Sequence, residues 1–277
     1  MCDVGQGDSI LIHQGFFQMV VDSGPDSRLL KCFERNMPVF DNTIEWVVLT
    51  HYDKDHVGGF VNLFNRYHVL HVLLTPYVGE QTEEVKDFFN ALGEEIKEGA
   101  HIWLPFPNMV IEMPNSHHDL KVEVLWPTVS KEIRHEFYSN NSSETYLSDV
   151  ISQRPDSQKP KNDVSIVLLL TIDKVKVLLT GDLEAKGEQA LIEDGLIGKV
   201  DVLKIGHHGS KFSSTPAFLE SLQPELFLIS VGKGNQYGHP DTELIKKLTN
   251  LRKTIFRTDI DGEVTLFTNG TRIWSKH

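Results

Sequence analysis

Short apolar runs alternate with amphipathic stretches along this chain, and the alternation occurs twice. The first half predicts a hairpin over residues 8–21, a helix over 26–37, strands over 45–49 and 69–74, and helices over 57–64 and 80–98. The second half predicts strands over 164–170, 174–179, 200–205, 226–231, 254–257 and 262–268, with helices over 183–194, 216–222 and 242–251. Two such halves predict an α/β chain folded as an αββα four-layer sandwich, in which two mixed β-sheets pack face to face with helices outside.

The segment between the two halves has a different texture. Residues 103–126 alternate apolar and polar positions and contain prolines, a pattern typical of short antiparallel strands at a sheet edge. Residues 127–163 are polar and show no periodicity. We therefore predict a single domain over residues 1–277, with a polar insertion at 127–163 that is partly mobile and a candidate lid.

The densest group of polar positions follows the apolar run 45–49. It consists of four potential metal ligands on a strand-to-helix turn: His51, Asp53, Asp55 and His56. Imidazole nitrogen and carboxylate oxygen suit zinc or manganese, and alternate positions of an extended turn can face two different ions. His51 with Asp53 is expected to serve one ion, and Asp55 with His56 another. The competing interpretation is a solvated turn, where Asp and His are common.

Polar residues also follow other predicted strands. Asp182 comes directly after one of them and, because a carboxylate can bridge two metal ions, is the natural bridging ligand. His207 and His208 follow the strand 200–205, and strand alternation predicts that one of them faces the metal; which one stays open. Asp22 ends the hairpin and is either a turn former or a carboxylate that orients a ligand loop.

Composition narrows the classes of function. Of the 277 residues, 40% are hydrophobic and 24% are charged, as in ordinary globular proteins. No apolar window approaches the roughly 20 residues of a membrane span, and we find no signal-peptide pattern, so we expect a cytoplasmic chain. The formal charge of −12 argues against a simple electrostatic nucleic-acid binder but not against a nuclease. Cys2, in the predicted first strand, and Cys32 form no C-x-x-C motif and are expected to be reduced and structural.

Several motifs occur in a fixed order, at residues 3–9, 21–24, 50–59, 179–184, 203–210 and 231–240. They include Asp-Val-Gly-Gln-Gly-Asp-Ser at the start, His-x-Asp-x-Asp-His in the metal loop and Gly-His-His-Gly-Ser near the end. In this combination the chain resembles the metallo-β-lactamase superfamily and, within it, the hydrolase domains of ComEC-type competence proteins. The resemblance runs from Asp3 to about Gly262, leaves out the insertion, and implies the sandwich fold with a dinuclear site at one edge.

The resemblance also implies a ligand set. It assigns the first metal to His51 and Asp53, the second to Asp55, His56 and one of His207 and His208, and the bridge to Asp182. Two departures matter. Asp53 stands where the superfamily usually has His, although the ComEC-like branch also uses Asp. A further His of the superfamily is replaced by Asn162 and Asp163, so the first metal is expected to be completed by water or weakly by one of these. A donor set rich in oxygen shifts the preference from zinc toward manganese, and both stay open for the two divalent ions.

These implications favour a phosphodiesterase or nuclease that acts on DNA or RNA, with a metal-bridging hydroxide attacking phosphorus. Asp55 and Asp182 would take part as ligands, while His239 and Lys233 would hold phosphate oxygens, and His239 would protonate the leaving group. Lys204 and Lys211 are further cations near the motif loops.

Two other functions compete with this one. A small-molecule phosphodiesterase, acting on a phosphorylcholine ester or a cyclic nucleotide, is favoured by the acidic charge and the absence of a basic stripe. A non-catalytic binding or effector module that keeps its metal for structure is the alternative from another class. A protein partner over the insertion stays open.

Overall fold

The computed structural model describes residues 1–113, 118–127 and 162–275. Most of the predicted insertion, residues 128–161, lies outside these described residues. The prediction that the insertion is mobile and serves as a lid therefore concerns residues outside the described part of the chain.

The first half of the chain forms a five-stranded sheet. Its strands follow the order β1 (Ile10–Gln14), β2 (Phe17–Val21), β3 (Thr43–Leu49), β4 (His68–Leu74) and β5 (His101–Trp103). The β1–β2 hairpin is antiparallel and the other neighbours are parallel, so the sheet is mixed. The helices of this half are α1 (Arg28–Asn36), α2 (Lys54–Val57), α3 (Phe60–Phe64) and α4 (Glu83–Lys97). Thr82 caps α4 by accepting a hydrogen bond from the backbone N–H of Val85.

The second half forms a seven-stranded sheet. Its order is β12 (Thr254–Arg257), β11 (Leu226–Ile229), β10 (Val202–Lys204), β9 (Val175–Leu179), β8 (Val167–Ile172), β7 (Leu120–Trp126) and β6 (Met109–Glu112). Strands β9 to β12 are parallel, whereas β6 to β9 are antiparallel. The helical segments are η1 (Asn162–Val164), α7 (Ala185–Glu193), η2 (Gly206–Gly209), α8 (Pro216–Leu222), α9 (Thr242–Asn250) and α10 (Thr258–Asp261). A separate hairpin pairs β13 (Leu266–Thr268) with β14 (Ile273–Ser275).

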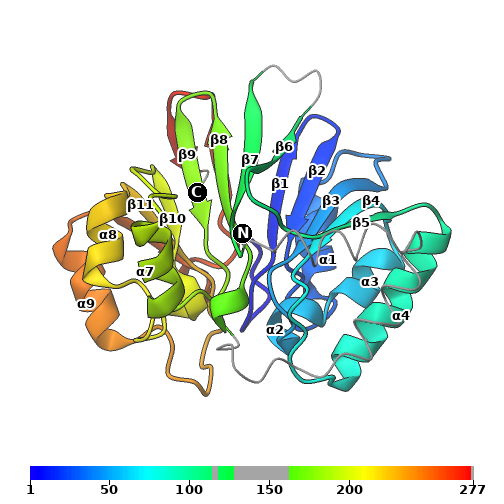
Figure 1. Ribbon diagram of the computed structural model, residues 1–277, viewed down its shortest axis with the longest axis horizontal. Helices are drawn as coiled ribbons and strands as arrows, with labels where there is room; N and C mark the ends of the chain where they lie inside the picture. The colour runs from blue at the N-terminus through cyan, green and yellow to red at the C-terminus, as the bar shows by residue number, and fades with distance from the viewer. Residues whose placement is uncertain (114–117, 128–161, 276–277) are drawn as a thin grey trace.

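Four layers follow from where the apolar side chains lie. Met19 and Val48 of the first sheet pack against Leu168 and Leu179 of the second, and this contact forms the central core. The outer face of each sheet is covered by the helices of its own half, with α1, α3 and α4 on one side and α7, α8 and α9 on the other. Figure 1 shows this arrangement, with both sheets in the middle and the helices outside. The predicted αββα sandwich is confirmed.

The structure changes the prediction at two places. Among the described residues of 103–126, only β6 and β7 are antiparallel neighbours, because β5 starts earlier and adds a parallel edge to the first sheet. The predicted strand over 262–268 is shorter, since α10 ends just before it and only β13 is extended. A buried Thr258 starts α10 and exchanges side-chain hydrogen bonds with the backbone of Val231, which explains the extra turn.

The prediction that both cysteines are reduced is wrong. Cys2 and Cys32 form a disulfide, with their Cα atoms 5.7 Å apart. Cys2 does not belong to a strand, because β1 begins only at Ile10, and the preceding segment runs beside α1. Sequence spacing could not show this contact, which depends on how the N-terminal segment packs on a helix that follows the hairpin.

No helix in the described part of the chain is long and apolar enough to cross a membrane.

Candidate metal centre

The metal loop lies where β3 gives way to α2, as predicted. Strand β3 ends at Leu49, and the carbonyl of Asp53 accepts hydrogen bonds from two N–H groups of α2, 2.8 Å from His56 N and 2.9 Å from Val57 N. The side chain of Asp53 accepts no N-cap hydrogen bond, and its Oδ2 lies 4.0 Å from Nε2 of His51. The loop therefore turns its imidazole and carboxylate groups toward the same side.

Asp182 enters the site from the end of β9, next to the metal loop. The preceding Gly181 has a positive φ of 51°, and a Cβ there would lie 3.1 Å from the side chains of Thr50 and Ser165. The hydroxyl of Ser165 accepts a hydrogen bond from the backbone N–H of Asp182 at 3.2 Å. Glycine thus allows the ends of β9 and β3 to approach closely enough for Asp182 to reach His51.

His207 and His208 lie in η2 rather than on the strand, because β10 ends at Lys204. Both have left-handed backbone conformations, with φ of 48° and 52°. The two rings are therefore not sent to opposite faces, as strand alternation would require. Nε2 of His207 lies 3.8 Å from Asp182 and Nε2 of His208 lies 3.5 Å from it. Of the two, only His208 belongs to the buried group of candidate ligands, and His207 is partly exposed, so which of them binds a metal stays a prediction.

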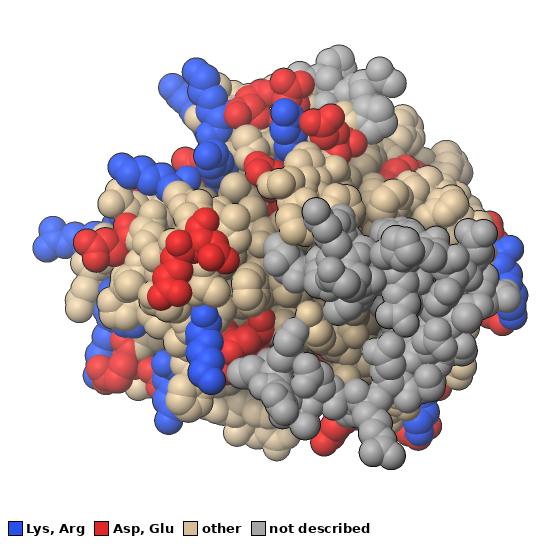
Figure 2. All heavy atoms as spheres, in the orientation of Figure 1, with Lys and Arg blue, Asp and Glu red and all other residues tan. Residues whose placement is uncertain are grey.

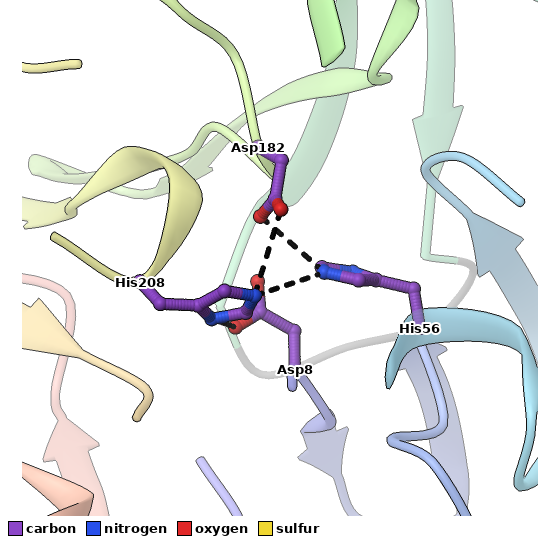
Figure 3. Close-up of side chains that lie close together, drawn as sticks. All are labelled: Asp8, His56, Asp182 and His208. Atoms are coloured by element: carbon purple, nitrogen blue, oxygen red, sulfur yellow. Dashed lines mark hydrogen bonds and ion pairs between the residues drawn. The ribbon is translucent and has the colours of Figure 1, made fainter. Parts of the chain in front are cut away.

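Four imidazoles converge on the Asp182 carboxylate. The shortest distances from Nε2 to a carboxylate oxygen are 3.8 Å for His51, 3.3 Å for His56, 3.8 Å for His207 and 3.5 Å for His208. Asp55 adds a second carboxylate, with Oδ2 3.2 Å from Nε2 of His208. Figure 3 shows that His56, Asp182 and His208 arrive from separate segments of the ribbon and point toward one another.

The other ring nitrogen, Nδ1, of each imidazole is held by a neighbouring oxygen. The Nδ1 partners are Thr50 Oγ1 for His51 at 3.1 Å, Asp22 Oδ2 for His56 at 2.7 Å, Glu184 Oε1 for His207 at 2.9 Å and the Ser230 carbonyl for His208 at 2.9 Å. A hydrogen bond of this kind places the proton on Nδ1 and leaves Nε2 as the nitrogen that can bind a metal. Of the two interpretations of Asp22, the orienting carboxylate agrees with this contact.

Asp8 belongs to the same cluster and was missed by the sequence analysis. Its Oδ1 lies 3.4 Å from Nδ1 of His208, and its Oδ2 is paired with the buried ammonium of Lys204. Asp8, His56, Asp182 and His208 form a buried group whose ligand atoms lie within 4.8 Å of one another. Asp8 is part of the first motif, directly before β1, so the motif was visible although its place at the site was not.

Lys204 does not hold a phosphate, contrary to the prediction that counted it among the available cations. Its side chain is fully buried, and its ammonium donates to the Gly181 carbonyl at 3.0 Å besides pairing with Asp8. Lys204 therefore acts behind the site, on the two segments that carry Asp8 and Asp182.

The buried charges of the cluster stabilise one another. Burial alone would lower the pKa of His208, but the surrounding carboxylates, led by Asp182, raise it to about 10. Burial would likewise raise the pKa of Asp8, but Lys204 and His208 lower it to about 2. The imidazoles also outweigh burial at Asp182 and hold its pKa well below the usual range. His51 differs, because burial and the neighbouring His56 lower its pKa.

The remaining candidates lie around this cluster. The ring of His239 lies 5.4 Å from the ring of His207, and burial is the main cause that lowers the pKa of His239. Lys233 is exposed on the same loop, between β11 and α9. Asn162 contacts Nδ1 of His207 at 3.1 Å and Glu184 at 3.2 Å. Asn162 thus reaches the side of the ring that faces away from Asp182.

The donor set fits divalent metal ions. Nε2 of His51 is buried, with a residue exposure of 1%, and has no hydrogen-bond partner among the described residues. An orphaned imidazole nitrogen of this kind, aimed at a buried carboxylate, is costly unless a ligand satisfies it. Mixed imidazole and carboxylate donors are the ligands that zinc and manganese take in proteins.

The fold and the buried His/Asp cluster together define a protein of the metallo-β-lactamase fold with a candidate metal centre. Residues 2–156 match the family model described as the metallo-beta-lactamase superfamily, and the chain belongs to that superfamily. The family predicted from the motifs is confirmed.

Two bacterial proteins match nearly the whole chain. It is 28% identical over 284 residues to ComE operon protein 3 of Bacillus subtilis (strain 168), covering 95% of this chain and 32% of that protein. It is 27% identical over 271 residues to Recombination protein 2 of Haemophilus influenzae, covering 95% of this chain and 28% of that protein. The chain therefore spans about a third of the length of these relatives.

Solved structures share the fold at low identity. Igni18, a metallo hydrolase from Ignicoccus hospitalis, superposes with a TM-score of 0.56 at 12% identity, over 95% of this chain and 96% of that chain. Zn²⁺-bound PqqB from Methylobacterium extorquens gives 0.52 at 11% identity, over 93% of this chain and 86% of that chain. These likenesses support the architecture alone.

Proposed function

We propose that this chain is a phosphodiesterase that uses two divalent metal ions, zinc or manganese, and acts on nucleic acid. The observation that carries the proposal is the convergence of four imidazole Nε2 atoms on Asp182, each with its Nδ1 already held by a neighbouring oxygen. Buried imidazoles and carboxylates are the side chains that bind metal ions, and burying them without a ligand costs free energy of folding.

The distances support a division of the ligands into two groups that share Asp182. His51, Asp53 and His207 would hold the first ion, and Asp55, His56 and His208 the second. In this assignment His207 supplies the ligand that the first ion lacked in the sequence analysis. Two divalent ions held in this way supply a nucleophile at neutral pH and neutralise charge on a phosphate.

The residues around the ions have separate tasks. Asp22, Glu184 and Asp8 hold imidazoles in their orientation from behind. His239, whose ring contacts His207, is placed to hold a phosphate or leaving-group oxygen, and Lys233 on the same loop can attract the diester. Nucleic acid is the favoured substrate because one relative is named a recombination protein, and another, from Neisseria gonorrhoeae, is named a competence protein.

A small phosphodiester is the second candidate. It is favoured by the formal charge of −12 and by the surface in Figure 2, where the acidic and basic side chains among the described residues are interspersed rather than gathered into a basic stripe. A salt titration of substrate binding separates the two candidates, because several phosphate contacts produce a steep loss of affinity with salt.

The test combines metal analysis with a panel of diesters. Asp182→Ala should abolish both metal uptake and hydrolysis of plasmid DNA, RNA, a cyclic dinucleotide and p-nitrophenyl phosphorylcholine, because it removes the carboxylate at the centre of both ligand groups. The matched control is Asp194→Ala, which removes an exposed carboxylate at the end of α7 and should leave both properties unchanged. Full activity in the Asp182 variant would contradict the proposal. Bound metal without turnover on any diester would favour the non-catalytic module.

A further inference from the structure

The loop between β11 and α9 lies at the end of the molecule where α2 also lies (Figure 1), and this loop carries an exposed aromatic ring. The residue is Tyr237, which is 64% exposed. Burial does not hold this ring in place, so its position depends on the backbone that carries it.

The backbone of this loop is fixed by one side chain. Asn235 Oδ1 accepts hydrogen bonds from the N–H groups of Tyr237 and His239, both at 3.1 Å. Asn235 Nδ2 donates to the carbonyls of Gly232 at 3.0 Å and His239 at 2.6 Å. These four hydrogen bonds hold the loop backbone in one conformation, and the loop exposes a large ring to solvent. An aromatic ring held on a fixed backbone is suited to binding a ligand.

A series of ring contacts connects Tyr237 to the metal centre. The Tyr237 and His239 rings are nearly parallel, with 15° between their planes and 6.2 Å between their centroids. His239 in turn meets His207 edge to face at 5.4 Å, and His207 Nε2 lies 3.8 Å from Asp182. A substrate group lying against Tyr237 would therefore be separated from the centre where the diester is cleaved by the rings of His239 and His207.

Basic side chains accompany exposed rings on two of the motif segments, although the whole chain is acidic. Lys233 is exposed on the same loop as Tyr237. On the segment that follows η2, Phe212 is 58% exposed, and Nζ of Lys211 lies 5.0 Å from the centre of its ring. Aromatic faces combined with cations are the chemistry that binds unstacked bases and their phosphates.

We propose that Tyr237 is a specificity residue: its ring stacks on a nucleobase beside the phosphate that is cleaved, which selects nucleotide diesters over diesters with alkyl groups. The inference rests on the proposed function, since it takes the cluster around Asp182 to be the site of cleavage. The base must be unstacked from its neighbours to lie on the ring, so the preferred substrate is a single-stranded segment or a strand end.

The test compares a short oligothymidylate with an abasic analogue that has the same sugar–phosphate backbone. Binding is followed by fluorescence anisotropy in EDTA, where no turnover interferes. The wild type should bind the base-bearing strand more tightly, and Tyr237→Ala should weaken that binding by about 5- to 160-fold while leaving the abasic strand unchanged, as expected from a contribution of about 1–3 kcal/mol for one stacked base. Tyr237→Phe keeps the ring and should retain the preference.

Phe16→Ala is the matched control, because it removes a ring that is 75% exposed at the turn of the β1–β2 hairpin, at the far end of β1 from Asp8. It should leave both affinities unchanged. Equal binding of the two strands by the wild type, or an undiminished preference in Tyr237→Ala, would overturn the inference whether or not the protein hydrolyses diesters. Absence of hydrolysis in the diester panel, together with a ring-dependent preference for bases, would count against the proposed function alone.

Discussion

A fully buried lysine, Lys204, is paired with Asp8, a buried aspartate of the candidate metal cluster. Removing two charges from water is unfavourable unless they are paired and hydrogen-bonded. Asp8 and Lys204 meet that condition, because they pair with each other and contact His208 and the Gly181 carbonyl. The pair therefore holds His208 and the Asp182 turn in place, and its cost is offset by this positioning.

Lys204→Met should destabilise the fold strongly, because it leaves the Asp8 carboxylate buried without its cation. We expect a loss of about 3–5 kcal/mol in the free energy of unfolding, measured by denaturant titration in EDTA. The double variant Lys204→Met/Asp8→Asn should lose less than the sum of the two single changes, since the unpaired charge is gone. Lys199→Met, at an exposed position before β10, serves as control and should change stability by no more than about 0.5 kcal/mol. Additive effects in the double variant would contradict the pairing.

For individual residues, the sequence was sufficient to group candidate site residues that are close together in the chain. His51, Asp53 and His56 share one turn, so local spacing was sufficient to group them. Asp8 could not be assigned in this way, because its partners His208 and Lys204 lie near the other end of the chain. For the same reason Lys204 was taken for an accessible cation: a lysine next to a motif loop looks identical in sequence whether it is buried or exposed.

At the scale of elements, the short N-terminal segment before β1 contacts the site directly. It carries Asp8, whose N–H donates to the Asp55 carbonyl at 3.1 Å, and the Cys2–Cys32 disulfide ties its start to α1. Gly7 has a φ of 121°, and a Cβ there would lie 2.0 Å from the Asp55 carbonyl oxygen, so only glycine permits this contact. Periodicity could not predict such a segment, because it is neither strand nor helix.

The disulfide should contribute measurably to stability. It closes a loop of 30 residues, for which chain entropy gives about 3–4 kcal/mol in the free energy of unfolding. Cys2→Ser/Cys32→Ser should lose an amount of this order, and reduction of the wild type with dithiothreitol should produce a similar loss. Thiol titration of the denatured, unreduced protein should find no free thiol. Two titratable thiols in protein purified without reductant would show that the disulfide does not form, and would support the earlier expectation of a reducing compartment, since disulfides persist mainly in oxidising ones.

Secondary structure was the more predictable part at this level. The apolar runs that became β3, β4, β9 and β11 each end in consecutive buried residues, so their composition identified them as strands. The conformation of the His207–His208 turn was harder to predict, because histidine rarely adopts the left-handed conformation that both residues have. Strand alternation assumes an extended backbone, which these two residues do not have.

In the whole molecule, the proposed ligands come from both halves of the sandwich. The β3–α2 turn belongs to the first sheet, whereas Asp182 and the His207–His208 turn follow strands of the second. The two sheets are also joined by apolar contacts across the central core and by the buried pair of Asp8 and Lys204. Metal ions held between the two sets of ligands would therefore link the sheets at their edge, and the stability of the entire fold should respond to metal.

This link predicts that metal stabilises the folded protein and that Asp182 carries the effect. At a free concentration of Mn²⁺ or Zn²⁺ about 100 times the dissociation constant, the free energy of unfolding should rise by about 2.7 kcal/mol per site if the unfolded chain does not bind the ion. Thermal or denaturant unfolding with increasing metal, compared with EDTA, measures the increase. Asp194→Ala should respond like the wild type, whereas Asp182→Ala should show little response, because both ligand groups lose their shared carboxylate. If a metal strengthened the Asp182 variant as much as the wild type, the ion would bind elsewhere, and the cluster would not be the metal centre.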